Sequence, residues 1–186
     1  MSNIIVYSGP MKCGKTQEIL NEYKRQLISG KKVKMFKPKI DNRTIGLVQA
    51  NSGIDIPAVE INRIQELENY NADVYCIDEF QLLKGSVETI QKMADQGKKF
   101  FIAGLNLTSE KKPFGKMSDI LCIADEIHVL KSICDNCKSE EGVYSYYKGG
   151  KDTDIMIGSK GYLSLCRQCY DEIGQKENLK NMNVVI

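Results

Sequence analysis

Long hydrophobic runs are missing from this sequence of 186 residues. The longest apolar stretches, such as Ile4–Tyr7 and Phe100–Ala103, are far too short to cross a bilayer. A basic stretch followed by an apolar signal core is also missing at the N-terminus, where Met-Ser-Asn leads directly into a strand-like run. We therefore expect no membrane partner and a cytoplasmic location.

Charge of one sign is not in excess, and histidine is nearly absent. The 26 basic and 24 acidic residues give a net charge of +2, so composition gives no reason to expect a nucleic-acid partner. The one histidine, His128, lies away from every motif described below, and we expect it at the surface or at a strand edge. Five lysines alternate along a predicted strand, and most of them are expected to be solvated: Lys31, Lys32, Lys34, Lys37 and Lys39.

Four of the seven cysteines form two close pairs. The pairs are Cys134 with Cys137 and Cys166 with Cys169, each with C-x-x-C spacing, and 28 residues separate them. Together they offer four thiolates for a tetrahedral Zn²⁺ site, which would be structural because no position is left for water. A pair of disulfides or a redox motif is the alternative. The other cysteines are expected to be packing residues: Cys13, Cys76 and Cys122.

Strand and helix patterns alternate along the first part of the chain. We predict strands at 3–8, 32–36, 73–77 and 98–103, and helices at 15–29, 62–70 and 86–96. The polar stretch between 39 and 57 reads as a long loop or a weak hairpin. The repeated strand-helix-strand order predicts an α/β fold, with a parallel sheet and helices on both faces.

The character of the sequence changes near Ile127. The stretch from 134 to 169 is rich in Tyr, Gly and Cys and predicts a small lobe. We therefore divide the chain into an α/β domain at 1–130, a zinc-binding domain at 131–175 and a tail at 176–186. The last stretch, 171–186, is compatible with a helix or with a loose tail.

A phosphate-binding loop lies between the first predicted strand and helix. Its residues match G-x-x-x-x-G-K-[ST] in full: Gly9, Pro10, Met11, Lys12, Cys13, Gly14, Lys15 and Thr16. Glycines let the backbone N–H groups approach a phosphate, Lys15 can reach the β- and γ-phosphates, and the Thr16 hydroxyl can bind Mg²⁺. The flanking elements favour this reading over an accidental glycine-rich turn, so we predict a P-loop NTPase-type domain that binds ATP and Mg²⁺.

Two carboxylates end the predicted strand at 73–77. Ligands in such sheets bind at the carboxyl ends of the strands, so Asp78 and Glu79 should face the phosphate loop. Asp78 is then a partner for Mg²⁺, and Glu79 could take the proton from an attacking hydroxyl. An acidic strand end that caps the next turn is the alternative. Many ATPases also place a Glu after this Asp, so the pair alone does not separate a kinase from a hydrolase.

With these motifs in place, the chain resembles the type II thymidine kinases, a compact zinc-bearing family. The resemblance runs from Gly9 to Tyr170 and depends on the order of its motifs. These are Gly9-Pro10-Met11, Lys37-Pro38 with Asp41-Asn42-Arg43, Asp78-Glu79-x-Gln81, Lys112-Pro113-Phe114-Gly115, and Gly161-Tyr162 before Cys166-Arg167-Gln168-Cys169-Tyr170.

The resemblance implies specific roles. Glu79 would be the general base for a nucleoside 5′-hydroxyl, with Lys15 and Arg43 assisting, and the zinc domain would carry a lid over the base. Asp41, Asn42, Arg43 and Gln81 would join the phosphate loop and Asp78 at the ATP site. The nucleoside would contact Met11, Phe80, Ser109, Phe114, Tyr162 and the stretch Thr153, Asp154, Ile155, Met156 and Ile157. The resemblance also implies a cytosolic homotetramer that accepts thymidine and deoxyuridine.

The base pocket departs from the family pattern. Ser109 stands where the family usually has a Phe, Asn106-Leu107 replaces Asp-Gly, and Phe80 and Leu82 also differ from the usual residues. Loss of a ring removes stacking surface worth about 1 kcal/mol, and Phe80 could refill part of that space. The prediction is therefore phosphorylation of thymidine, with another deoxynucleoside as an alternative. A rival is a zinc-ribbon P-loop ATPase that acts on nucleic acid.

Overall fold

The computed structural model describes residues 3–49, 53, 55–148 and 161–182. Its elements in chain order are β1 (Ile4–Ser8), α1 (Lys15–Ile28), β2 (Val33–Pro38), β3 (Leu47–Gln49), β4 (Asp55–Pro57), β5 (Val59–Ile61), η1 (Ile64–Asn69), β6 (Val74–Ile77), η2 (Phe80–Leu82), α2 (Glu88–Asp95), β7 (Lys99–Gly104), α3 (Met117–Ile123), β8 (Glu126–Val129), β9 (Tyr144–Tyr147), β10 (Tyr162–Leu165) and α4 (Arg167–Met182). The elements η1 and η2 are 3₁₀ helices.

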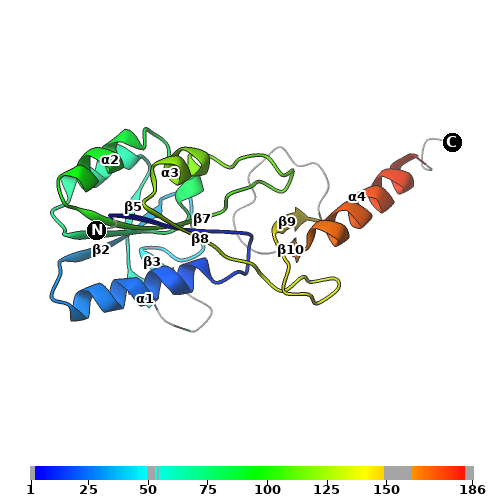
Figure 1. Cartoon of the computed structure of the whole chain (residues 1–186), viewed down its shortest axis with the longest axis horizontal. Coiled ribbons are helices and arrows are strands. Elements are labelled where there is room, and N and C mark those ends of the chain that lie inside the picture. The colour runs from blue at the N-terminus through cyan, green and yellow to red at the C-terminus, as the bar shows by residue number, and fades with distance from the viewer. Residues whose placement is uncertain (1–2, 50–52, 54, 149–160, 183–186) are drawn as a thin grey trace.

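A six-stranded parallel sheet forms the larger part of the molecule, in the order β5-β2-β6-β7-β1-β8. Every residue of β1 and of β6 is buried, which agrees with the continuous apolar runs of both segments. In Figure 1, α1 covers one face of this sheet and α2 and α3 cover the other. The predicted parallel sheet with helices on both faces is confirmed.

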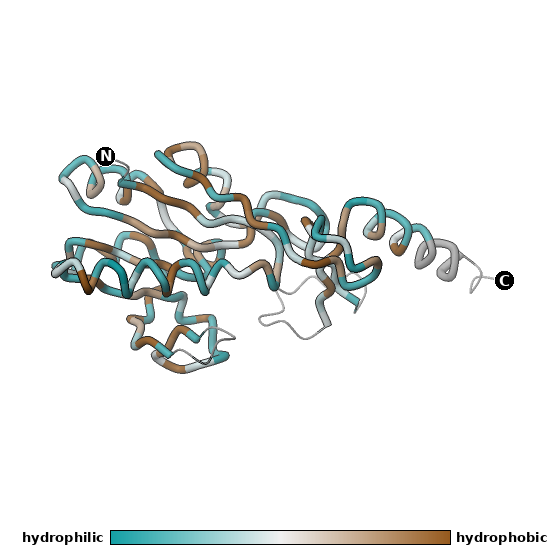
Figure 2. Tube along the Cα trace, turned by 60° about the horizontal axis from the view of Figure 1, so that its bottom comes forward, coloured by the Kyte–Doolittle hydropathy of each residue, from teal (hydrophilic) through white to brown (hydrophobic). Residues whose placement is uncertain are grey.

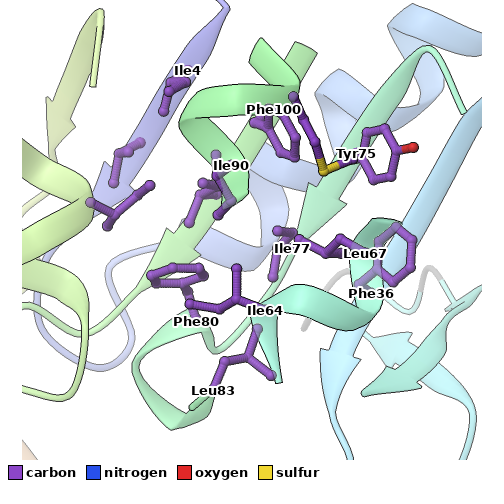
Figure 3. Packing of buried hydrophobic residues seen from close by; sticks show 14 of the residues in the cluster. Ile4, Phe36, Ile64, Leu67, Tyr75, Ile77, Phe80, Leu83, Ile90 and Phe100 are labelled. Carbon is purple, nitrogen blue, oxygen red and sulfur yellow. The ribbon is translucent and has the colours of Figure 1, made fainter. Parts of the chain in front are cut away.

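The two faces of the sheet carry separate hydrophobic cores, because neighbouring side chains of a strand point to opposite faces. Ile19 and Leu20 of α1 pack with Ile5 on one face. On the other face Ile4 joins a larger cluster, part of which Figure 3 shows. There Tyr75, Phe36, Phe100, Ile77 and Leu67 lie close together.

Several local predictions needed correction. The helix predicted at 62–70 is the short 3₁₀ helix η1, in which Ile64 and Leu67 are buried at the i, i+3 spacing that shares one face at three residues per turn. The polar stretch from 39 to 57 contains the antiparallel pair β3 and β4, which is the weak hairpin alternative. No element was predicted for α3 or β8, since the first is only 7 residues long and the second is mostly exposed.

His128 lies on β8, at the edge of the sheet, as predicted. Its ring stacks on Tyr7 of the neighbouring strand at a centroid distance of 4.8 Å. Its Nε2 is 2.7 Å from a carboxylate oxygen of Glu126. These contacts explain the position of the single histidine by packing and by an ion pair.

A small lobe follows the sheet and contains the antiparallel ribbon of β9 and β10. Its core consists of Cys134, Tyr146, Leu165, Cys166 and Cys169. Residues 171–182 of the C-terminal stretch belong to the helix α4, which confirms the helical alternative for them, and Figure 1 shows this helix running away from the lobe towards the C-terminus. Figure 2 shows mostly hydrophilic colouring along the coloured part of α4, and none of the helices in the described part of the chain is long and apolar enough for a membrane span.

Candidate active site and metal centre

The phosphate loop connects β1 to α1 through a turn that requires glycine at both ends. A Cβ on Gly9 would collide with the backbone oxygen of Leu130 and would lie 2.9 Å from the Cys13 Sγ. Gly14 has open space around it, but its φ of 89° is a left-handed conformation that side chains disfavour. The two glycines of the motif therefore serve different purposes: close approach at Gly9 and backbone conformation at Gly14.

The tip of this loop presents unengaged backbone donors. Among the described residues, the N–H groups of Lys12, Cys13 and Gly14 donate to no acceptor. Helix α1 begins directly after them at Lys15, and a helix N-terminus favours an anion. The Lys15 Nζ folds back over the loop, 2.5 Å from the Pro10 backbone oxygen. This arrangement is suited to bind a polyphosphate.

Asp78 and Thr16 come together at the carboxyl ends of the strands. The Thr16 Oγ1 lies 3.1 Å from Oδ2 of Asp78, whose residue is only 6% exposed. Burial, and after it the negative charge of Glu79, raises the pKa of the Asp78 carboxyl to about 7. A nearby cation favours the ionised form of such a carboxyl. Two oxygen donors at this spacing fit the ligand chemistry of Mg²⁺.

Glu79 is held by two neighbours and by a strained backbone. Its φ of 52° is left-handed, which is rare for a residue with a side chain and costs about 1–3 kcal/mol. One carboxylate oxygen accepts from Arg43 Nη2 at 2.6 Å, and the other accepts from Gln81 Nε2 at 2.5 Å. Gln81 is fixed in turn, because its Oε1 accepts from the backbone N–H of Leu105 at 3.0 Å. The carboxylate of Glu79 therefore has a defined orientation.

Arg43 is held by Asp41, which is buried and also pairs with Lys37. Its guanidinium donates to both carboxylate oxygens of Asp41, at 2.6 and 2.9 Å. Lys37 Nζ lies 3.3 Å from the same carboxylate and donates to the Thr44 backbone oxygen at 2.6 Å. Burial acts to raise the pKa of Asp41, but the hydrogen bonds and charges of Arg43 and Lys37 outweigh it and hold that pKa below its ordinary value.

The structure thus brings Asp41 and Arg43 next to Glu79, while Asn42 between them is exposed. Lys37 is the exception to the expectation that most of the five lysines are solvated, since it is 1% exposed. Its signal in the sequence was Asp41, four residues further along the chain.

The residues predicted to contact the nucleoside occupy varied positions. Phe80 is not brought to the surface: it is fully buried and packs near Ile64 and Leu83, as Figure 3 shows. Met11, Phe114, Ser109 and Tyr162 are half-buried. The stretch from Thr153 to Ile157 lies outside the described residues, and its role stays a prediction.

The loop that carries Ser109 contacts the small lobe. The backbone oxygen of Ser109 accepts a hydrogen bond from the Tyr170 hydroxyl at 2.5 Å. Lys111 Nζ lies 4.1 Å from the centroid of the Tyr170 ring and 4.7 Å from that of Tyr144. These contacts join the region of the predicted base pocket to the cysteine-rich lobe.

The four predicted metal ligands form one cluster. The Sγ atoms of Cys134, Cys137, Cys166 and Cys169 all lie within 4.8 Å of one another. A zinc tetrahedron with bonds of about 2.3 Å has sulfur–sulfur edges of about 3.8 Å, and the distance between Cys137 and Cys166 is 3.8 Å. The backbone N–H of Cys166 donates to the Cys134 Sγ at 3.3 Å, which favours a thiolate. The cluster could hold a structural zinc ion.

Three residues that the sequence did not predict join the lobe to the phosphate loop. Ser145 and Ser164 bond to the backbone of Met11, and Asp135 pairs with Lys12. Only Asp135 lies inside a recognised motif, between two cysteines of the first pair. Isolated serines in a ribbon carry no spacing signal of their own.

Comparison with known proteins agrees with this geometry. The family model described as thymidine kinase matches residues 2–170. A thymidine kinase of Pseudothermotoga lettingae is 30% identical over 176 residues, which cover 91% of this chain and 95% of the relative. A thymidine kinase of Porphyromonas gingivalis is 35% identical over 173 residues, with 90% and 84% covered. Since the family model spans the sheet, the phosphate loop and all four cysteines, this chain belongs to the thymidine kinase family.

Proposed function

We propose that this protein transfers the γ-phosphoryl group of ATP to the 5′-hydroxyl of thymidine, and that deoxyuridine is also a substrate. Membership of the family supports the nucleoside. The proposed chemistry depends on the two carboxylates that directly follow β6. Asp78 bonds to Thr16 of the phosphate loop, while Glu79 beside it is oriented by Arg43 and Gln81. This arrangement supports a metal-binding role for Asp78 and a proton-accepting role for Glu79.

The phosphate loop would stabilise the charge that develops during transfer. The free N–H groups at Lys12, Cys13 and Gly14 would bind phosphate oxygens, and Lys15 would exchange its contact with Pro10 for the β- and γ-phosphates. The Thr16 hydroxyl and the Asp78 carboxylate would hold Mg²⁺. This ion supplies Lewis-acid neutralisation of the phosphate oxygens when it is bound.

Glu79 would accept the proton of the 5′-hydroxyl. Its two oxygens already accept bonds from Arg43 and Gln81, but a carboxylate has about four acceptor sites, so a hydroxyl can be added. Arg43 is 40% exposed in its side chain, and it could also reach a transferring phosphate from its place beside Glu79. Both roles follow from the position of the pair.

The proposal also includes the domain boundaries, the cellular location and the oligomeric state of the protein. We propose domain boundaries near 130 and 175, a cytoplasmic location and a homotetramer. The sheet ends with β8 at Val129, and the cysteine-rich lobe begins shortly afterwards, which supports the first boundary. Light scattering of the purified protein tests the tetramer, because a monomeric mass would contradict it.

The function is tested with labelled ATP, Mg²⁺ and each deoxynucleoside in separate reactions. We expect thymidine monophosphate as the main product and deoxyuridine monophosphate as the second. Phosphorylation of a different deoxynucleoside would support the alternative specificity. ATP hydrolysis that DNA stimulates, without formation of any nucleoside monophosphate, would overturn the proposal in favour of a nucleic-acid ATPase.

A further inference from the structure

Two serines of the small lobe form hydrogen bonds to the backbone of one residue of the phosphate loop. The backbone N–H of Met11 donates to the Ser145 Oγ at 2.9 Å, and the Ser164 Oγ donates to the Met11 backbone oxygen at 2.6 Å. Ser145 on β9 and Ser164 on β10 are paired directly across the ribbon, so that both hydroxyls face the same residue. The exposed fractions of the two serines are 5% and 0%, and both bonds are partly buried because Met11 is itself half-buried.

A third contact joins the next residue of the loop to the same lobe. Lys12 Nζ lies 2.9 Å from Oδ2 of Asp135. Asp135 is itself tied to Ser164: its Oδ2 accepts from the Ser164 N–H at 2.8 Å, and its own N–H donates to the Ser164 oxygen at 2.7 Å. The Lys12 side chain is 42% exposed, so this ion pair contributes less than the buried serine bonds.

These contacts between the lobe and the phosphate loop lie at Met11 and Lys12, where the backbone of the loop is strained. Lys12 has a φ of 62°, a left-handed conformation that side chains disfavour. Such a conformation persists only where surrounding contacts fix it. The bonds to the N–H and oxygen of Met11 fix the residue immediately before Lys12, and the ion pair fixes the side chain of Lys12 itself. The free N–H groups of the loop begin at this residue.

We propose that Ser145 and Ser164 are positioning residues of the ATP site. By holding Met11 they keep the phosphate loop in the conformation that presents its N–H groups to ATP. This inference rests on the proposed function, in which residues 9–16 bind ATP. A zinc ion bound by the four cysteines would support these contacts, because Cys134 adjoins Asp135 and Cys166 lies two residues after Ser164.

The test compares two double-site changes with a matched control. The variant with both Ser145→Ala and Ser164→Ala removes both hydroxyls that contact Met11. The control is Ser132→Ala, because Ser132 is a buried serine of the same lobe whose hydroxyl bonds to the Gly142 oxygen at 3.4 Å, within the lobe. A variant with Ser145→Thr and Ser164→Thr retains both hydroxyls and tests rescue.

We expect the double alanine variant to bind ADP about tenfold more weakly by isothermal titration calorimetry, which corresponds to about 1.4 kcal/mol. The KM for ATP should rise by a similar factor, while the zinc content stays unchanged. The control should bind ADP like the wild type, and the threonine variant should recover at least part of the affinity. A purely structural role would not give a loss of ADP affinity at unchanged zinc content that hydroxyls at the same two positions restore.

The outcomes separate this inference from the proposed function. A double alanine variant with wild-type ADP affinity overturns the inference, even if the enzyme phosphorylates thymidine. If the wild type itself binds neither ATP nor ADP, the proposed function fails. If the double variant loses zinc, the single variant Ser145→Ala carries the test, since it removes only the bond to the Met11 N–H. An unchanged ADP Kd in that variant likewise overturns the inference.

Discussion

At the scale of single residues, the site depends on carboxylates in contrasting surroundings. Asp78 is buried beside a hydroxyl, and its pKa is raised to about 7 by burial and by the charge of Glu79. Glu79, directly after it, is fixed by Arg43 on one oxygen and by Gln81 on the other. The left-handed backbone at Glu79 directs these two successive side chains to different partners.

Glu79→Gln is expected to lower kcat by about 10²- to 10⁴-fold, which is the usual contribution of a general base. The amide has the same size but cannot accept the proton of the 5′-hydroxyl. Steady-state kinetics should show the loss, while calorimetry should show an unchanged Kd for ADP. Glu141→Gln, at an exposed ion pair with Lys131, is the control and should retain full activity. Full activity of Glu79→Gln would remove the assigned chemistry.

Ser109→Phe is expected to lower the KM for thymidine about fivefold, because a stacking ring contributes about 1 kcal/mol. Ser109 is half-buried, and its backbone is held by the Tyr170 hydroxyl, so the new ring would start from a fixed position. Ser109→Ala removes the hydroxyl without adding a ring and should leave KM unchanged. An unchanged or higher KM for Ser109→Phe would argue against a base pocket at this loop.

At the scale of elements, the short 3₁₀ helix η2 connects the Glu79 carboxylate to the loop before α3. Gly115 in that loop has a φ of 53°, and a Cβ there would collide with the backbone oxygen of Gln81. Gln81 in turn holds Glu79 and bonds to Leu105 at the end of β7. A change at Gly115 should therefore reach the carboxylate through Gln81.

Gly115→Ala is expected to lower the free energy of unfolding by about 2–3 kcal/mol and to reduce kcat. Gly46→Ala is the matched control, since Gly46 has a similar φ of 63° but nothing within 4 Å of its added Cβ. That variant should lose only about 1 kcal/mol and keep its kcat. Urea denaturation and steady-state kinetics measure both effects. Equal losses in the two variants would show that the contact with Gln81 is unimportant.

At the scale of the whole molecule, the sheet and the small lobe meet at two loops of the site. The phosphate loop bonds to Ser145 and Ser164 of the lobe, and the Ser109 loop bonds to Tyr170. The lobe has a small core built around its four cysteines. A zinc ion bound by these cysteines would therefore add stability that so small a hydrophobic core does not supply.

Cys134→Ser is expected to abolish binding of one zinc ion per chain. The Tm should fall by roughly 10 °C, because a structural zinc stabilises by several kcal/mol and 1 kcal/mol shifts the Tm of a chain of this size by about 2–4 °C. Metal analysis and thermal unfolding measure the two changes. Cys122→Ser is the control, since Cys122 is exposed on α3 and outside the cluster, and it should retain the metal. Zinc retained by Cys134→Ser would contradict a four-cysteine site.

The amino-acid sequence was sufficient to predict the parts whose signal is local. The phosphate loop, the acidic strand end and the two cysteine pairs have fixed spacings, because each must place its groups around one phosphate or one metal ion. The strands β1, β6 and β7 were predictable as well, since burial on both faces requires continuous apolar runs. These features identified the fold class, the candidate ATP site and the candidate zinc site.

The contacts between these parts could be recognised only in the folded chain. Met11 bonds to Ser145 and Ser164, which are 134 and 153 positions away in the sequence, and no spacing pattern records such contacts. The burial of Lys37 beside Asp41 and the packing of Phe80 in the core also depend on neighbours supplied by other segments. Local spacing selects the chemistry of each group, whereas the pairing of strands and the docking of the lobe select its partners.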